Sequence, residues 1–166
     1  MKEFFVDVWN NRILLAPLIS WLVCQISKVI THLIIEREFS VERIMGDGGM
    51  PSGHSATVFA LAAMTGWTYG FDSAVFAIAT VLAVVVMHDA MGVRREAGKH
   101  AESIKEIAEH INDFLKEKDV KIRTEKIKKL VGHTPLQVFV GASVGLLVAI
   151  IVCAICGISY KSGYFI

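Results

Sequence analysis

Two histidines at the entrances to apolar segments carry most of the chemistry of this sequence. His54 lies in the stretch GGMPSGHS, residues 48–55, and His133 lies in VGHTP, residues 131–135. An imidazole changes protonation near neutral pH, so it can act as a nucleophile or as a general acid. Two imidazoles among cations and backbone N–H donors are typical of a phosphoryl-transfer site. One attacks phosphorus and the other protonates the leaving oxygen.

Several residues near these histidines could bind phosphoryl oxygens. Ser52 can cap the helix that follows it, and the first N–H groups of that helix, from Gly53 onward, form an anion site. Arg94 and Arg95 are adjacent, so on a helix their side chains diverge by about 100°. We therefore expect one arginine to face the site and the other to face water or lipid headgroups, as an ordinary charge at the end of a span.

A polar stripe runs along the first apolar segment. Gln25, Lys28 and His32 recur at i, i+3 and i+7, and Arg37 follows them. A lysine inside a membrane span is costly unless it reaches the interface or finds a partner. Lys28 and Arg37 are therefore further candidate phosphate ligands, with snorkelling to the interface as the alternative role for Lys28. We expect His32 to pack within the bundle.

These residues must be positioned by membrane helices. The chain has 166 residues, of which 54% are hydrophobic, and its mean hydropathy is +0.53. A membrane span needs about 20 apolar residues. Four stretches qualify, the second and third only with polar residues at one end: Leu14 to Ile35, Pro51 to Phe71, Ser73 to Val93 and Leu136 to Cys156. We predict an all-α, polytopic membrane protein with about four spans and a single domain, residues 1–166; a soluble helical bundle is the alternative.

The distribution of positive charge predicts the orientation. Residues 94–132 hold eleven Lys and Arg, and residues 36–50 hold two, against three on the opposite side (Lys2, Arg12 and Lys161). Because cytoplasmic loops are enriched in Lys and Arg, both segments are expected in the cytoplasm and both termini outside. The polar clusters described above then converge at the cytoplasmic end of the bundle.

Residues 94–132 are predicted to form a charged cytoplasmic insertion. Isoleucines recur at helical spacing within residues 96–118, which predicts an amphipathic helix, and a second short helix is expected after it. The insertion could pack on the membrane domain or bind anionic headgroups. Residues 1–12 could form a short interfacial helix.

Two groups of small side chains have structural interpretations. Cys153 and Cys156 form a CxxC inside an apolar span, which favours packing thiols over a metal or redox site. Gly141 and Gly145, with Ala142 and Ser143 between them, suit close approach of helices or a homodimer.

The chain resembles the type 2 phosphatidic acid phosphatase superfamily, which includes vanadium-dependent haloperoxidases, and in particular a divergent bacterial branch of short membrane proteins. The superfamily motif PSGH is intact at residues 51–54. The first motif, KxxxxxxRP, is altered, since Lys28 and Arg37 are nine apart and no proline follows. Residues 132–145 resemble the end of the third motif, SRxxxxxHxxxD. The resemblance implies that His133 is the nucleophile and that Arg94 or Arg95 is the motif arginine.

The third motif also departs from the pattern of the superfamily. Gln137 stands where the motif has Asp, and an amide can orient an imidazole but cannot supply charge. Asp89 could substitute for that carboxylate, or it could pair with an arginine. Arg94 and His100 also fit part of the motif spacing, but Ile104 stands where Asp is required, so we favour His133 over His100.

Three functions remain open on these observations. The first is a metal-independent phosphatase for a lipid phosphate or diphosphate at the cytoplasmic leaflet of the plasma membrane, with no cofactor and no nucleic-acid partner. The second is a non-catalytic protein that binds phosphate or phospholipid. The third is a small transporter that uses Lys28, His32 and Asp89 as an intramembrane relay.

Overall fold

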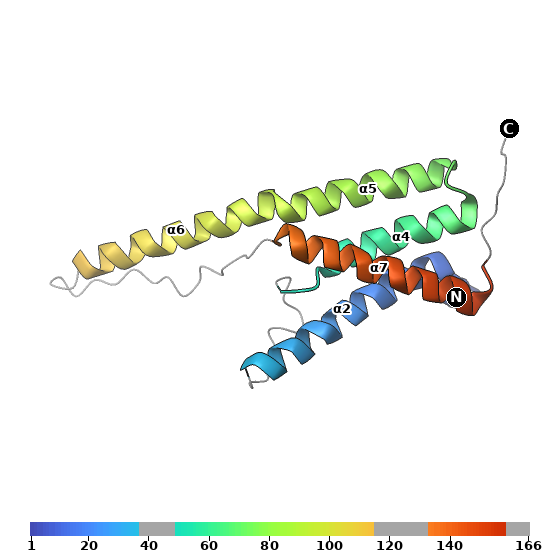
Figure 1. Ribbon diagram of the computed structural model, residues 1–166, viewed down its shortest axis with the longest axis horizontal. Coiled ribbons are helices and arrows are strands. Elements are labelled where there is room, and N and C mark those ends of the chain that lie inside the picture. The colour runs from blue at the N-terminus through green and yellow to red at the C-terminus, as the bar shows by residue number, and fades with distance from the viewer. Residues whose placement is uncertain (37–48, 115–132, 159–166) are drawn as a thin grey trace.

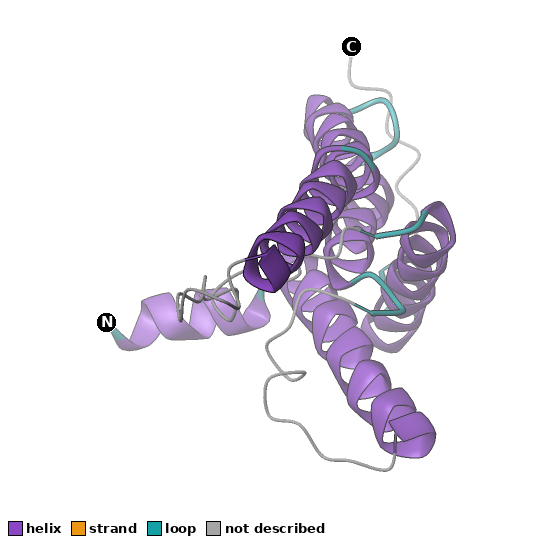
Figure 2. Ribbon diagram, turned by 90° about the vertical axis from the view of Figure 1, so that its left-hand side faces the viewer, coloured by secondary structure: helices purple, strands orange, loops and turns teal. Residues whose placement is uncertain are grey.

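The computed structural model describes residues 1–36, 49–114 and 133–158, and every regular element within these ranges is a helix (Figures 1 and 2). The helices are α1 (Lys2–Asn10), α2 (Arg12–Glu36), α4 (Gly53–Tyr69), α5 (Ala74–Met91), α6 (Val93–Phe114) and α7 (Pro135–Cys156). The predicted all-α class is confirmed, and the four apolar stretches match α2, α4, α5 and α7 to within two residues at each end.

Among the described residues, three segments are long and apolar enough to cross a membrane. They are Arg12–Ile34 in α2, the segment that starts with α5 at Ala74, and α7. Helix α4 has 17 residues, about 26 Å at 1.5 Å per residue, which is shorter than a hydrocarbon core of about 30 Å. The count of four spans therefore stays a prediction, although α4 lies among the other three helices.

Helix α4 is the centre of the bundle and packs against α2, α5 and α7. Small side chains make this possible: Ala56 and Ala60 are fully buried and Ala63 nearly so. Met64 fills the space beside them, with its Sδ 3.5 Å from the Sγ of Cys153. This contact supports the interpretation of Cys153 as a packing thiol.

Two glycines allow α7 to lie directly on α4. A Cβ atom at Gly141 would collide with the carbonyl oxygen of Ser52, and one at Gly145 would collide with that of Ala56. We predicted either close approach of helices or a homodimer for these small residues, and the structure shows close approach of two helices within one chain. Since α4 and α7 run side by side in the same direction, their N-termini lie at one end of the bundle (Figure 1).

Local capping signals explain where the helices begin. Ser52 accepts a hydrogen bond from the N–H of Ser55 at 3.4 Å, which confirms it as the cap of α4. Thr134 and Gln137 form a reciprocal capping box at the start of α7. Because these contacts satisfy N–H groups that a helix leaves unpaired, both starts are fixed by residues within three positions.

The two remaining helices extend away from the bundle. Helix α6 continues in nearly the direction of α5 after Gly92 and projects beyond the other helices (Figure 1). It confirms the predicted amphipathic helix as far as Phe114; the second short helix lies outside the described residues. Helix α1 stands to one side (Figure 2), with Phe4 and Trp9 64% and 75% exposed.

Candidate functional site

Two helix N-termini meet at the site. The backbone N–H of Ser52, just before α4, donates a hydrogen bond to the carbonyl oxygen of Gln137 in the first turn of α7, at 3.1 Å. Each helix N-terminus carries a partial positive charge and N–H groups directed outward. Two of them at one end of the bundle make a local environment that favours an anion.

The two histidines lie next to each other at this point. The ring centroids of His54 and His133 are 6.3 Å apart, with the ring planes inclined by 57°. His54 is in the first turn of α4, and His133 directly precedes the cap of α7. The structure thus brings together two residues that lie 79 positions apart in the sequence.

His133 is held from a third helix as well. Its backbone N–H donates to the carbonyl oxygen of Ala90 in the last turn of α5, at 3.0 Å. Its side chain is 3% exposed, whereas that of His54 is half-buried. The backbone of His133 is therefore held by α5 as well as by α7, and its imidazole is shielded from water beside His54.

Gln137 lies beside the ring of His133. Its Oε1 accepts the N–H of Thr134 at 2.9 Å, which identifies that atom as oxygen, and it lies 3.3 Å from Nδ1 of His133. An acceptor at this position favours the tautomer with the proton on Nδ1, which leaves the Nε2 lone pair for nucleophilic attack. An orienting role of the uncharged Gln137 amide stays a prediction.

Ser52 and Gly53 have tightly packed surroundings. The hydroxyl of Ser52 is fully buried and accepts the hydroxyl of Ser55 at 2.9 Å in addition to the Ser55 N–H. A Cβ at Gly53 would stand 3.3 Å from Cδ1 of Trp21, so glycine lets α4 start against α2. These contacts fix the position of the α4 N-terminus; phosphate binding by Ser52 and Gly53 stays a prediction.

Lys28 reaches the segment that leads into α4. Its side chain is only 8% exposed, and its Cγ would be 3.8 Å from a Cβ built on Gly49, which has a φ of +97°. A side chain on Gly49 would thus be strained by its backbone and would touch the lysine stem. The lysine is therefore on the site side of α2.

Gln25 of α2 is a polar residue that the sequence did not mark as a site residue, although a glutamine one turn before Lys28 in an apolar span is unusual. It is 8% exposed, and its Oε1 has no hydrogen-bond partner in the described part of the chain. This combination of burial and an unpaired oxygen is visible only in the structure.

The structure connects the remaining predicted site residues less directly to His54 and His133. Arg94 and Arg95 are in the first turn of α6, just after the helix whose Ala90 carbonyl holds His133. Asp89 is the neighbour of Ala90 on α5 and is half-buried. Arg37 lies outside the described residues. His100 is exposed on α6, whereas His133 lies beside His54, which favours His133 as the reactive histidine.

Comparison with known proteins identifies the family of the chain. The model of the Divergent PAP2 family matches residues 9–148, which include both histidines and α2 to α7 as far as Val148. The chain is 36% identical over 152 residues to the uncharacterized membrane protein YuiD of Bacillus subtilis (strain 168), in an alignment covering 88% of this chain and 96% of that protein. No solved structure matches the chain.

Proposed function

Because the chain belongs to the Divergent PAP2 family, we propose that it is a membrane-embedded phosphatase that hydrolyses a lipid phosphate or diphosphate through a phosphohistidine. The observation that carries the proposal is the 6.3 Å separation of His54 and His133 where two helix N-termini meet. Reacting groups in enzyme complexes stand about 3–3.5 Å apart, and two rings whose centroids are 6.3 Å apart are close enough for one phosphoryl group to contact both.

The proposed reaction has two steps. Nε2 of His133 attacks phosphorus, the bond from phosphorus to the lipid oxygen breaks, and His54 gives its proton to that oxygen. Water then attacks the phosphohistidine, His54 takes a proton from the water, and inorganic phosphate leaves while His133 is restored. Gln137 keeps the His133 ring in the reactive tautomer during both steps.

Cations and backbone donors stabilise the phosphoryl oxygens in this proposal. The N–H groups of the first turn of α4, beginning at Gly53, supply fixed dipoles, and Ser52 holds that turn in place. Lys28 and one of Arg94 and Arg95 supply charge, with Arg37 as a further candidate. No metal ion or cofactor takes part in the proposed steps.

The proposed location is the cytoplasmic face of the plasma (inner) membrane. The apolar helices and the relative named as a membrane protein support a membrane location. The excess of Lys and Arg in residues 94–132 supports a cytoplasmic site with both termini outside.

A second candidate function is phosphate or phospholipid binding without turnover. It is favoured by one specific observation, the uncharged Gln137 Oε1 beside Nδ1 of His133. A carboxylate there would stabilise the positive imidazole that forms as His133 attacks, and an amide does not. Such a protein would retain a pocket for anions while its chemistry is slow.

Phosphate release by the purified protein tests the proposal. The protein in detergent is offered lipid monophosphates and diphosphates without added metal, alongside His133→Ala and a matched control, His100→Ala, which removes an exposed histidine from α6. We expect turnover in the wild type and the control and none in His133→Ala. Vanadate binding without any turnover would instead establish the binding protein, and turnover that survives His133→Ala would exclude His133 as the nucleophile.

A further inference from the structure

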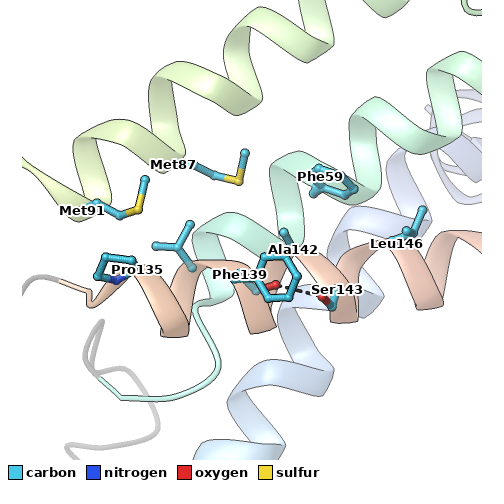
Figure 3. Close-up of a pocket in the computed structure, with 9 residues that line it drawn as sticks. Phe59, Met87, Met91, Pro135, Phe139, Ala142, Ser143 and Leu146 are labelled. Atoms are coloured by element: carbon cyan, nitrogen blue, oxygen red, sulfur yellow. Dashed lines mark hydrogen bonds between the residues drawn. The ribbon is translucent and has the colours of Figure 1, made fainter.

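An apolar groove of about 450 Å³ opens on the outer face of the bundle between α5 and α7 (Figure 3). Met87 and Met91 of α5 form one wall, Phe59 of α4 lies at its back, and the other wall is a face of α7. The groove exists because α5 packs on α4 and makes little direct contact with α7. Its volume is within the range of small-molecule sites, about 300–1,000 Å³.

One end of the groove is lined by residues close to His133. Pro135, the first residue of α7, lines it two positions after His133. Met91 lines the opposite wall and follows Ala90, whose carbonyl accepts the N–H of His133. A molecule in the groove would thus have one end at the phosphoryl site.

The length of the groove matches one leaflet of a bilayer. Its lining on α7 runs from Pro135 to Leu146, twelve residues whose eleven steps span about 16 Å of helix. Half of a hydrocarbon core of about 30 Å is about 15 Å. The groove therefore leads from the level of the phosphoryl site toward the middle of the membrane.

The lining suits a hydrocarbon chain. Its only hydroxyl among the lining side chains, that of Ser143, donates to the carbonyl oxygen of Phe139 at 3.0 Å (Figure 3), so it does not require a partner from a ligand. The thioethers of Met87 and Met91 are flexible and adapt to an irregular apolar surface. A polar or charged ligand would lose its hydration here without compensation.

We infer that this groove binds a hydrocarbon chain of the substrate lipid, whose phosphate lies at His54 and His133. The inference rests on the proposed function, because it assigns one end of the bound lipid to that site. On this inference the substrate is a long-chain lipid of the leaflet that contains the phosphoryl site, and it enters the groove laterally from the bilayer. Discrimination between lipids then depends on the chain as well as on the phosphate.

A photoreactive lipid tests the groove directly. The probe is a phosphatidic acid with a diazirine in the middle of one acyl chain, irradiated with the protein in phosphatidylcholine nanodiscs, and adducts are located by mass spectrometry. We expect adducts on Phe59, Met87 and Phe139, displaced by excess dioleoyl phosphatidic acid but not by dioleoylglycerol. Competition by dioleoyl phosphatidic acid, with none by dioleoylglycerol, would link the groove to the anion site.

Two alanines of α7 provide the variant and its control. Ala142→Trp fills the groove, whereas Ala154→Trp adds the same side chain at an exposed position of the same helix outside it. Each buried CH₂ group of the lipid chain is worth about 0.8 kcal/mol. Displacement of two such groups from the groove therefore lowers labelling about tenfold. Ala142→Leu replaces the tryptophan variant if the latter does not elute as a monodisperse protein.

The outcomes separate the groove from the catalysis. Adducts spread over outward residues such as Leu147, unaffected by Ala142→Trp or competed equally by dioleoylglycerol, would mean that ordinary bilayer lipid fills the groove, and the inference fails. Phosphate release is measured on the same samples. Specific groove labelling without release overturns the catalytic proposal only, and release without groove labelling overturns the groove only.

Discussion

The backbone N–H of Ser52 and the carbonyl oxygen of Gln137 are joined by a hydrogen bond of 3.1 Å. One residue precedes the helix that carries His54, and the other is in the first turn of the helix that follows His133. The bond therefore ties together the two segments that hold the histidines. Gly141 makes this approach possible, since any side chain there would collide with the Ser52 carbonyl.

Replacing Gln137 tests whether charge or orientation limits the reaction. Gln137→Glu preserves the capping box and places a carboxylate near Nδ1 of His133. An opposite charge at this distance stabilises the positive imidazole that forms as His133 attacks, so we expect kcat to rise about tenfold, equivalent to about 1.4 kcal/mol. Steady-state phosphate release measures this.

Gln137→Ala is the matched comparison. It removes the orienting oxygen and the reciprocal cap, which costs about 1 kcal/mol of stability and lowers kcat. A Glu variant no faster than the wild type would mean that orientation of His133, and not charge beside it, limits the rate.

Gly141→Ala should destabilise the protein and weaken activity together. The added methyl group forces α7 away from Ser52, at a cost of about 1–3 kcal/mol for overpacking. A displacement of about 1 Å between His54 and His133 is enough to lower kcat about 100-fold. Thermal unfolding followed by circular dichroism, with phosphate release on the same preparation, measures both effects.

The control for this variant is Leu147→Ala on the same helix, where the side chain is 60% exposed. It should leave both the midpoint and the rate close to those of the wild type. Equal behaviour of the two variants would show that the contact between α4 and α7 does not depend on Gly141.

Lys28→Met should weaken anion binding. The substitution keeps the apolar stem beside Gly49 and removes the charge, so we expect the Kd for vanadate to rise about tenfold, equivalent to about 1.4 kcal/mol. Lys99→Met is the control, because Lys99 pairs with Glu96 at 2.6 Å on an exposed face of α6. Equal affinity of Lys28→Met and the wild type for vanadate would remove Lys28 from the site.

Cysteine accessibility tests the orientation and the role of α4. In a variant with Cys24, Cys153 and Cys156 replaced by alanine, Glu3→Cys should react with an impermeant maleimide in intact cells. His100→Cys should react only after permeabilisation, because the four-span topology requires α2, α4 and α5 to cross the membrane between these positions. Reaction of both positions from the same side would show that only two of those helices cross.

Local sequence determined most of the helical structure. The bounds of α2, α5 and α7 follow from apolar length, and the starts of α4 and α7 follow from Ser52 and Thr134, because capping involves residues within three positions. The shortness of α4 could not be read in the same way, since the apolar stretch continued beyond the residues that are helical.

The candidate site was predicted in part for the same reason. His54 and His133 could be selected from their chemistry and from PSGH and GHTP, because residue type is a local property. Their approach to 6.3 Å depends on where Gly141 and Gly145 allow α7 to rest on α4. No spacing along one segment contains that information.

Tertiary packing alone decided which polar and apolar groups are buried and which segments meet. The burial of Gln25, the bond from His133 to the Ala90 carbonyl and the groove between α5 and α7 each join segments distant in sequence. Hydropathy identifies a membrane helix but not which of its faces meets another helix and which meets lipid, because both surroundings are apolar. The sequence therefore determined the helices and their reactive residues, and packing between small side chains determined how those residues meet.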